Sequence, residues 1–514
     1  MIDTTNSPVF LAVDFGAGSG RVMAGSYADQ RLHLEEIHRF PNNGIHLNGT
    51  WHWNVTRQFA DILEGLKRAA DTYGDRVVSI GIDTWGVDYG LLDAAGSLLG
   101  IPVQYRDSRT DDLMDTAFAR VPKEDIYRAT GNQFMPFNTL FQLLAEQAQN
   151  PGRLAAAERI LPMPDLFNYW LTGIAANEAT IASTLQLVSA DTGEWAWDLI
   201  DRLELPRKLF RDITPPGTVL GPLLPAIAEI TGLNSAQVVT VGSHDTASAY
   251  TGVPLAFDSE SDASTVDGEG EIFLSSGTWS LLGTRVDNAV INEESFNLAF
   301  TNERDTTGQI RLLKNHCGMW LMQECKRIWD QEEDLTWEQL VAEAEAAEPF
   351  VSFIDPDDPR FAKRGDMPAK LKEACAATGQ PVPETRGAIT RMVYESLAIM
   401  YSVSIDHLAH LTGKTLGTLH VVGGGCQNNL LNQFTANALG RKVLAGPVEA
   451  TALGNLLSQL VAAGHLSDLH EGRALIMNSF PPQTFEPQER QAWETARTRF
   501  RNTWDWRRAD FNSL

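Results

Sequence analysis

The sequence has few cysteines, and their spacing suggests no disulfide framework. Only four occur in 514 residues: Cys317 and Cys325 are eight positions apart, while Cys375 and Cys426 stand alone. No CxxC motif is present, so the cysteine usage fits a reducing compartment. A zinc site built from His316, Cys317 and Cys325 is an alternative, but its spacing matches no standard zinc pattern, and buried thiols are the preferred interpretation.

Long apolar runs and targeting signals are also missing. The first residues, MIDTTNSPVF, contain neither a basic segment nor an apolar one, so no signal peptide is expected. No stretch approaches the ~20 apolar residues that a membrane span requires. We therefore expect a cytoplasmic protein with no membrane partner.

Basic residues are scarce relative to acidic ones. Lys and Arg total 41 against 66 Asp and Glu, which gives a net charge of −25. Such a field repels nucleic acid, although backbone N–H groups in a local pocket can still bind a nucleotide. The apolar fraction of 43% is ordinary for a globular protein, and the length predicts two or three domains.

Predicted strands and helices alternate along the chain, which indicates the α/β class. Each half begins with a strand, a glycine-containing turn and a return strand, and later has a helix followed by a buried strand. We predict two similar domains, residues 1–250 and 251–514, around a cleft. The predicted strands are 9–14, 21–27, 32–38, 77–82, 238–241, 271–274, 279–284, 419–422 and 442–445. The predicted helices are 56–73, 388–411, 428–439 and 450–463.

Two further regions have a distinct composition. Residues 123–229 read as mainly helical with proline and glycine breaks. Residues 254–270 are polar, acidic and short of aromatics, which is typical of a solvated surface loop.

The first glycine-rich loop, residues 14–21, lies between two predicted strands. Its glycines let the backbone approach a ligand closely, and successive N–H groups in such a turn can form an anion-binding nest. Asp14 at the strand end can hold Mg²⁺, usually through water, and Arg21 offers a guanidinium to a phosphate. The alternative is a tight hairpin with an exposed aspartate.

Two common nucleotide motifs do not fit. The first loop comes close to GxGxxG, but that motif needs a helix directly after it, and residues 22–24 favour a strand. Gly413-Lys414-Thr415 matches the end of a P-loop, but the residue five positions earlier is Leu408 rather than glycine. Gly413 is instead predicted to end a helix.

Two loops in the second half could complement the first. Residues 275–278, Ser-Ser-Gly-Thr, end a predicted strand with hydroxyls that can bind phosphate oxygens. Residues 423–425 are three glycines after a buried strand, where α/β proteins usually place a ligand. Each alone could be a simple turn, but a triphosphate between two walls needs donors from both.

The segment His244-Asp245-Thr246 follows the predicted strand 238–241. A phosphoryl transfer needs a carboxylate that accepts the proton of the attacking hydroxyl, and Asp245 lies between the two phosphate-type loops in sequence. The alternative is a helix N-cap aspartate; the two roles are compatible.

Residues 82–88 (IDTWGVD) combine carboxylates with a tryptophan after a buried strand. Aromatic faces pack on sugar C–H surfaces and carboxylates accept hydroxyls, so a sugar site is one interpretation and a turn with a core tryptophan is the other. Residues 105–109 could brace this segment or form a surface ion pair.

Taken together and in this order, the motifs resemble the FGGY carbohydrate kinases, and within them the branch that acts on L-rhamnulose. The resemblance spans nearly the whole chain. It is carried by AVDFGAGSGRVM (12–23), GIDTWGVDYGLLD (81–93), YRDSRT (105–110), GSHDTASA (242–249), LSSGTWSLLG (274–283), LLKNHCGMWLMQE (312–324), VVGGGCQNNLLNQ (421–433) and GPVEATALGN (446–455).

The resemblance implies two actin-like, ribonuclease-H-like domains joined by a hinge, and transfer of the ATP γ-phosphoryl group to the primary hydroxyl of a ketose with Mg²⁺. It implies Asp245 as the base. Residues implied to contact the nucleotide are Ala17, Gly18, Ser19, Gly20, Arg21, Thr278, Gln323 and Gly424. Residues implied to contact the sugar are Gly86, His244, Asp245, Thr246 and Asn315.

Two departures bear on the substrate. Gly18 stands where relatives of that branch often have serine, which removes a hydroxyl donor, and the acidic stretch 254–270 is longer than expected. The alternatives are a kinase of L-fuculose or of another deoxyketose or pentulose, an actin-like ATPase, or a non-catalytic sugar sensor; the sensor should have lost Asp245. We expect a monomer or a homodimer.

Overall fold

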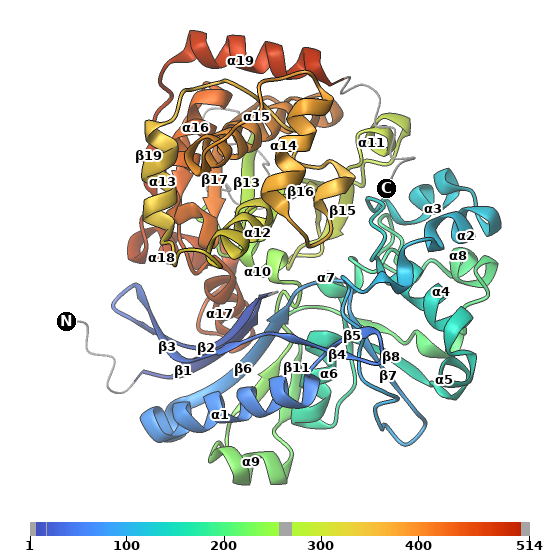
Figure 1. Cartoon of the computed structure of the whole chain (residues 1–514). Helices are drawn as coiled ribbons and strands as arrows, with labels where there is room; N and C mark the ends of the chain where they lie inside the picture. Colours follow the sequence, from blue (N-terminus) through green and yellow to red (C-terminus); the bar gives the residue numbers. More distant parts are fainter. Residues whose placement is uncertain (1–6, 17, 256–269, 505–514) are drawn as a thin grey trace.

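The structure is a computed structural model that describes residues 7–16, 18–255 and 270–504. It contains two large mixed sheets, each flanked by helices, which confirms the α/β class. In Figure 1 the blue and green first half lies below the yellow to red second half. The predicted loop 254–270 falls almost entirely outside the described residues, as does Ala17.

The first sheet has six strands in the order β11-β12-β6-β1-β2-β3. The hairpins β1–β2 and β2–β3 are antiparallel, β6 runs parallel to β1, β12 runs parallel to β6, and β11 is antiparallel to β12. The bounds are β1 Val9–Phe15, β2 Ser19–Ala28, β3 Arg31–Pro41, β6 Val77–Thr84, β11 Val219–Pro222 and β12 Gln237–Val239.

The second sheet has seven strands in the order β15-β16-β14-β13-β17-β18-β19. Read from β19 to β16, its pattern of parallel and antiparallel pairs repeats that of the first sheet, with β13, β14 and β16 in the places of β1, β2 and β3. The bounds are β13 Gly270–Ser276, β14 Trp279–Val286, β15 Thr301–Arg304, β16 Ile310–Cys317, β17 Leu416–Val422, β18 Val443–Ala445 and β19 Gln483–Phe485. The architectural repeat predicted from the two strand–turn–strand segments is therefore present.

Both faces of β1 are buried, which explains its continuous apolar run. Val9, Leu11 and Val13 pack with helix α1 (Val55–Tyr73), whereas Phe10 and Ala12 pack with helix α17 (Ala450–Ala462). Because side chains alternate along a strand, one strand contacts two helical layers. Helix α17 comes from the second half of the chain but packs against the first sheet (Figure 1).

The region between β6 and β12 is mainly helical, as predicted, with short two-stranded sheets. Its elements are β7 Tyr89–Leu92, α2 Leu113–Arg120, α3 Lys123–Thr130, α4 Thr139–Gln149, α5 Pro151–Ala156, β8 Arg159–Pro162, α6 Met163–Thr172, β9 Asn177–Glu178, α7 Ala179–Ala182, α8 Trp197–Arg202, β10 Ile213–Thr214 and α9 Pro225–Thr231. The small hairpin β4 Gly44–Leu47 and β5 Thr50–Trp53 precedes helix α1 Val55–Tyr73.

The remaining helices surround the second sheet and the junction of the two halves. They are α10 Asp245–Thr251, α11 Glu293–Asn297, α12 Trp320–Trp329, α13 Trp337–Ala346, α14 Met367–Ala377, α15 Arg386–Thr412, α16 Asn429–Leu439, α17 Ala450–Ala462, α18 Leu469–Ser479 and α19 Arg490–Thr503. Gly413 ends α15 in the left-handed conformation, with φ 65°, which confirms its predicted role. Across the described residues, none of the helices is both long and apolar enough to cross a membrane.

Candidate active site

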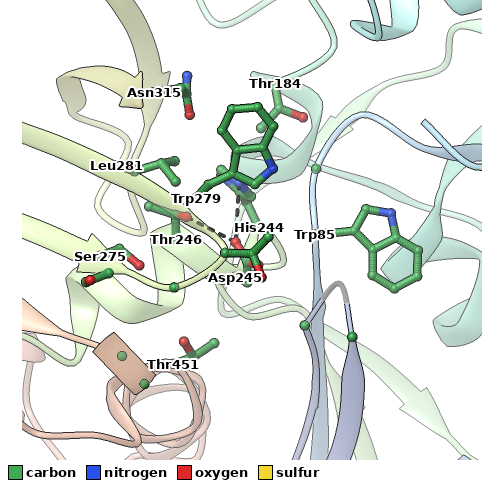
Figure 2. Close-up of a pocket in the computed structure, with 18 of the residues that line it drawn as sticks. Trp85, Thr184, His244, Asp245, Thr246, Ser275, Trp279, Leu281, Asn315 and Thr451 are labelled. Carbon is green, nitrogen blue, oxygen red and sulfur yellow. Dashed lines mark hydrogen bonds and ion pairs between the residues drawn. The ribbon is translucent and has the colours of Figure 1, made fainter. Parts of the chain in front are cut away.

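A cavity of about 560 Å³ is lined by residues from both halves of the chain (Figure 2). The predicted site residues that line it are Asp14, Gly18, Ser19, Arg21, Gly86, His244, Asp245, Thr246, Thr278, Asn315, Gln323 and Gly424. Gly20 is not among them: a Cβ there would lie 2.2 Å from Phe40 Cε2, so this glycine allows the hairpin to pack on Phe40. Ala17 lies outside the described residues.

The first loop joins β1 to β2 and is braced from behind. Gly16 N donates to Ser19 O at 3.0 Å, while Asn42 donates from Nδ2 to Gly16 O at 2.8 Å and from its backbone N to Gly18 O at 3.2 Å. A Cβ on Gly18 would meet no atom within 4 Å. The loop is thus held by β3 and its neighbourhood while Gly18 faces open space.

Arg21 is paired with two carboxylates. Its Nε and Nη2 donate to Asp14 Oδ2 at 3.0 and 2.7 Å, and its Nη1 lies 2.5 Å from Glu449 Oε2. Burial disfavours the guanidinium charge, but these two carboxylates outweigh it and raise the pKa of Arg21. That Arg21 binds a phosphate stays a prediction. In this structure Arg21 orients Asp14 and Glu449.

Three carboxylates meet where β1, β6 and α10 come together. Asp14 and Asp83 are register partners on adjacent parallel strands, and Thr84 forms a bridge with His244. Asp83 is fully buried and accepts a hydrogen bond from Asn455 Nδ2 at 2.6 Å. Burial, and then the charge of Asp14, raise the pKa of Asp83 well above its usual value, so Asp83 favours the neutral acid.

Asp245 is the first residue of α10 and points into the cavity (Figure 2). The N-cap of this helix is His244, without a side-chain capping bond, so the N-cap interpretation of Asp245 is wrong. Thr246 Oγ1 donates to Asp245 Oδ1 at 3.0 Å, and His244 Nε2 lies 3.5 Å from the same oxygen. Burial raises the pKa of Asp245, against the charge of His244 and with that of Asp14.

The backbone before Asp245 is fixed by the helical region. His244 N donates to Thr180 Oγ1 at 3.2 Å and Ser243 N to Glu178 Oε2 at 3.3 Å. Glu178 also caps α7 by accepting hydrogen bonds from the N–H groups of Thr180 and Ile181. The start of α10 is therefore anchored at several points before the catalytic candidate.

The opposite wall comes from β13, β14 and the glycines after β17. Gly423 has φ 82° and its Cβ would lie 3.0 Å from Ser276 O, while a Cβ on Gly425 would lie 2.1 Å from Ser276 Oγ. A Cβ on Gly424 would meet nothing within 4 Å. The outer glycines let the two loops pack together, and the middle one faces open space. Thr278 Oγ1 donates to Gln323 Oε1 at 3.2 Å.

Only part of the segment 82–88 lines the cavity, although one interpretation of its sequence made its carboxylates sugar contacts. Trp85 and Gly86 line the cavity. Asp88 does not: its Oδ2 accepts from Trp53 Nε1 (2.6 Å), Trp85 Nε1 (3.0 Å) and Tyr105 N (3.2 Å). Asp88 is therefore an internal anchor for Trp85. Tyr105 braces the segment through its backbone N–H, which is one of the two roles predicted for residues 105–109.

Three lining residues, Asn132, Gln133 and Glu303, are not predicted from the sequence, and Gln133 contacts the predicted Asn315. Asn315 N and Nδ2 donate to Gln133 Oε1 at 3.0 and 3.1 Å, which links the helical region to β16. Asn132 donates from Nδ2 to three oxygens, and its buried Oδ1 has no partner among the described residues. Glu303, on β15, faces His244 at 3.2 Å.

The predicted metal ligand Asp14 has an oxygen that Arg21 does not use, since both hydrogen bonds end on Oδ2. Among the described residues no group of three or more His, Cys, Asp or Glu is arranged to hold a metal ion. This does not support the zinc alternative: His316 Nδ1 lies 2.6 Å from Asp357 Oδ2 and its Nε2 2.9 Å from Ser404 Oγ, and all four cysteines are free and buried.

Comparison with known proteins gives matches over most of the chain. Residues 9–252 match the family model for the FGGY family of carbohydrate kinases, N-terminal domain, and residues 272–463 match that for its C-terminal domain. The chain is 44% identical over 493 residues to a rhamnulokinase of Bacteroides thetaiotaomicron, covering 96% of this chain and 99% of the relative. It is 43% identical over 480 residues to a rhamnulokinase of Enterococcus faecalis, covering 93% and 94%.

Solved structures give the same fold at lower identity. A ligand-bound xylulose kinase from Lactobacillus acidophilus aligns with a TM-score of 0.78 at 16% identity, covering 96% of this chain and 98% of that one. A glycerol kinase from Plasmodium falciparum, solved with ADP, aligns with a TM-score of 0.74 at 17% identity, covering 96% and 97%. The two family matches and the identity of 43–44% to the two rhamnulokinases show that the chain belongs to the FGGY family of carbohydrate kinases.

Proposed function

We propose that this protein transfers the γ-phosphoryl group of ATP to the primary hydroxyl at carbon one of L-rhamnulose, giving L-rhamnulose 1-phosphate. The main support is the arrangement of the cavity. Asp245 lies in it together with Gly18 and Gly424, which leave open space in the loops of the two halves, and with the polar side chains of Asn132 and Asn315. The substrate is supported by relatives named rhamnulokinase at 38–44% identity over at least 92% of this chain.

In this proposal Asp245 is the base. Thr246 and His244 both approach Oδ1, so Oδ2 is the oxygen proposed to accept the proton of the attacking hydroxyl. The sugar would lie against Gly86, His244, Thr246 and Asn315. The unpartnered Oδ1 of Asn132 adds an acceptor for a sugar hydroxyl, because a buried polar atom without a partner is costly.

ATP would lie between the two loop walls. Gly18, Ser19 and Arg21, which line the cavity, are proposed for the phosphates together with Ala17, which lies outside the described residues, whereas Gly20 packs on Phe40. Thr278, Gln323 and Gly424 are proposed for the nucleotide on the opposite wall, where a Cβ on Gly424 would meet no atom within 4 Å.

A Mg²⁺ ion fits the acidic end of the cavity. The charge of Asp14 raises the pKa values of Asp83 and Asp245, so a cation beside Asp14 would relieve this repulsion. Asp14 would hold the ion, through water or directly. When bound, the ion supplies neutralisation of the phosphate charge during transfer. The protein's own part is to hold Asp14 with Arg21 and to place Asp245 at the hydroxyl.

We further propose a cytoplasmic enzyme that acts on a small sugar and ATP without nucleic acid or membrane, as a monomer or homodimer, in rhamnose metabolism. The sparse cysteines and the net charge of −25 support this.

The two-domain division at residues 250 and 251 stays a prediction. We also propose that the halves close on the sugar, because water must be kept from the γ-phosphate.

The test is ADP release with Mg-ATP over a panel of ketoses, with Asp245→Asn beside the wild type. We expect strong stimulation by L-rhamnulose and a loss of about 10²–10⁴-fold in kcat in the variant, as is usual for a general base, with ATP binding retained. Asp93→Asn, in an exposed turn away from the cavity, is the control.

The outcomes separate the alternatives. Stimulation by L-fuculose or a pentulose instead would keep the mechanism and change the substrate. A near-normal rate in Asp245→Asn would remove it as the base. No stimulation by any sugar would favour an actin-like ATPase or a sugar sensor.

A further inference from the structure

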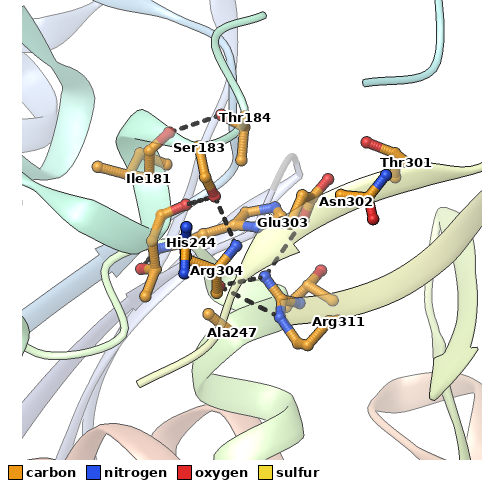
Figure 3. A network of polar contacts seen from close by, with 12 residues as sticks. Ile181, Ser183, Thr184, His244, Ala247, Thr301, Asn302, Glu303, Arg304 and Arg311 are labelled. Carbon is orange, nitrogen blue, oxygen red and sulfur yellow. Dashed lines mark hydrogen bonds and ion pairs between the residues drawn. The ribbon is translucent and has the colours of Figure 1, made fainter. Parts of the chain in front are cut away.

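A buried network next to Asp245 includes His244, Glu303 and Arg311 (Figure 3). Glu303 and Arg311 have no place in the roles proposed so far. Glu303 on β15 and Arg311 on β16 are register partners in an antiparallel pair. Glu303 is 5% exposed, His244 6% and Arg311 0%. These residues come from the two halves of the chain and meet at the cavity wall.

Basic and acidic side chains alternate along this network. Arg311 Nη2 donates to Glu303 Oε2 at 3.2 Å, the same oxygen lies 3.2 Å from His244 Nδ1, and His244 Nε2 lies 3.5 Å from Asp245 Oδ1. Arg311 is itself oriented by Arg304 O, which accepts from its Nη2 at 3.1 Å. Arg311 is therefore a fixed donor rather than a mobile one.

Glu303 is held as a carboxylate. Burial alone would raise the pKa of Glu303, but the neighbouring His244 and Arg311 hold it below its usual value. An ionised carboxylate only accepts hydrogen bonds, so the imidazole nitrogen facing it must carry a hydrogen. No group of the described residues makes a well-directed hydrogen bond with Nδ1, and Glu303 Oε2 lies 3.2 Å from it.

We propose that Glu303, anchored by Arg311, is a positioning residue that keeps a hydrogen of His244 on Nδ1 and so fixes the orientation of the imidazole beside Asp245. This rests on the proposed kinase function. Asp245 takes the proton of the sugar hydroxyl on Oδ2 and becomes a carboxylic acid, while His244 stays against Oδ1. No other bond forms or breaks. The imidazole is thereby fixed beside Asp245 and the sugar, and Oδ2 is left free for the hydroxyl.

The experiment uses Glu303→Gln in the full chain. The glutamine keeps the shape, and Arg311 selects its carbonyl oxygen, so its NH₂ group faces His244 and favours a hydrogen on Nε2 instead. We expect kcat to fall about tenfold to a hundredfold, as for a misplaced catalytic group, with the KM for ATP unchanged. Glu303→Asp, which keeps the charge, should recover part of the rate.

Two further measurements separate positioning from a merely structural role. In a His244→Asn background, Glu303→Gln should cause no further loss of kcat, because the residue it acts through is gone. The side-chain ¹⁵N shifts of His244, identified among the 11 histidines by their loss in His244→Asn, should report Nδ1–H in the wild type and Nε2–H in Glu303→Gln. Glu395→Gln, which breaks the buried pair of Glu395 with Arg391 at 2.7 Å, is the control and should leave kcat unchanged.

Three outcomes would overturn the proposal: normal turnover in Glu303→Gln, additive losses in the double variant, or a rise confined to the sugar KM, which would make Glu303 a direct sugar contact. Failure of the kinase function gives a different result. There the wild type releases no ADP with any sugar, while the ¹⁵N shifts still report whether Glu303 sets the hydrogen on Nδ1.

Discussion

Replacing Gly454 with alanine should lower both stability and turnover, because this glycine lies where α17 crosses α10. A Cβ on Gly454 would be 1.8 Å from Ser248 O and 2.8 Å from Gly252 N, and a Cβ on Gly252 would be 2.1 Å from Ala450 O. The blocking atoms are backbone, so no side chain can move aside. Helix α10 begins with Asp245, so a displaced helix displaces the proposed base.

The size of the effect follows from the geometry. Since Cβ contacts under 3.0 Å are essentially never seen, the two helices must separate by about 1.2 Å. Overpacking of this kind costs about 1–3 kcal/mol, and alanine offsets about 1 kcal/mol through its better helix propensity. Because the clash is with backbone, we expect a net loss of about 2 kcal/mol. A displacement of about 1 Å at a catalytic group can cost about 100-fold in rate.

The assay is calorimetric melting together with sugar-stimulated ADP release. Each kcal/mol should lower Tm by about 2–4 °C for a domain of about 150–250 residues. The matched control is Gly152→Ala in helix α5, where a Cβ meets nothing within 4 Å; it should keep the rate and hold or raise Tm. If Gly454→Ala keeps the Tm and kcat of the wild type, then close packing of α10 on α17 does not position Asp245.

Two other predictions concern the cavity itself. Burial raises the pKa of Asp245 and catalysis needs its ionised form, so kcat/KM should fall as pH falls through a midpoint above the ordinary aspartate value of about 4; a pH–rate profile with its acid midpoint at or below that value would contradict the assignment. Gly424→Ala places a methyl group where nothing lies within 4 Å, so Tm should stay unchanged while the KM for ATP rises; an unchanged KM would place ATP elsewhere.

Helices, strands and loops could be predicted from the sequence where a pattern of a few neighbouring residues determines them. The helix predicted over 388–411 is α15, Arg386–Thr412, and the two strand–turn–strand segments open the two sheets. The candidate loops could be found because glycine and hydroxyl residues directly follow apolar strands, and parallel strand ends meet at one edge of a sheet. Those signals need only a few neighbouring residues.

The rest depends on packing between distant segments. Glu303 sits in an ordinary strand and acquires its candidate role from Arg311, its register partner, and His244, 59 positions earlier in the chain. Asp88 has the composition of a sugar contact, yet Trp53 and Trp85 occupy its Oδ2. Nothing local distinguishes a carboxylate that faces a cavity from one that anchors its wall.

Helix α17 connects these observations, since it touches the acidic cluster at three points. Its N-cap residue Glu449 pairs with Arg21, Asn455 donates to Asp83, and Gly454 lies against α10, which carries Asp245. Burial and the charge of Asp14 raise the pKa of Asp83 against the hydrogen bond from Asn455, whereas burial raises the pKa of Asp245 against the charge of His244. A change that shifts α17 should therefore disturb the position of Asp245 and the charge balance around it together. This is why Gly454→Ala should cost more in turnover than its loss of stability alone would produce.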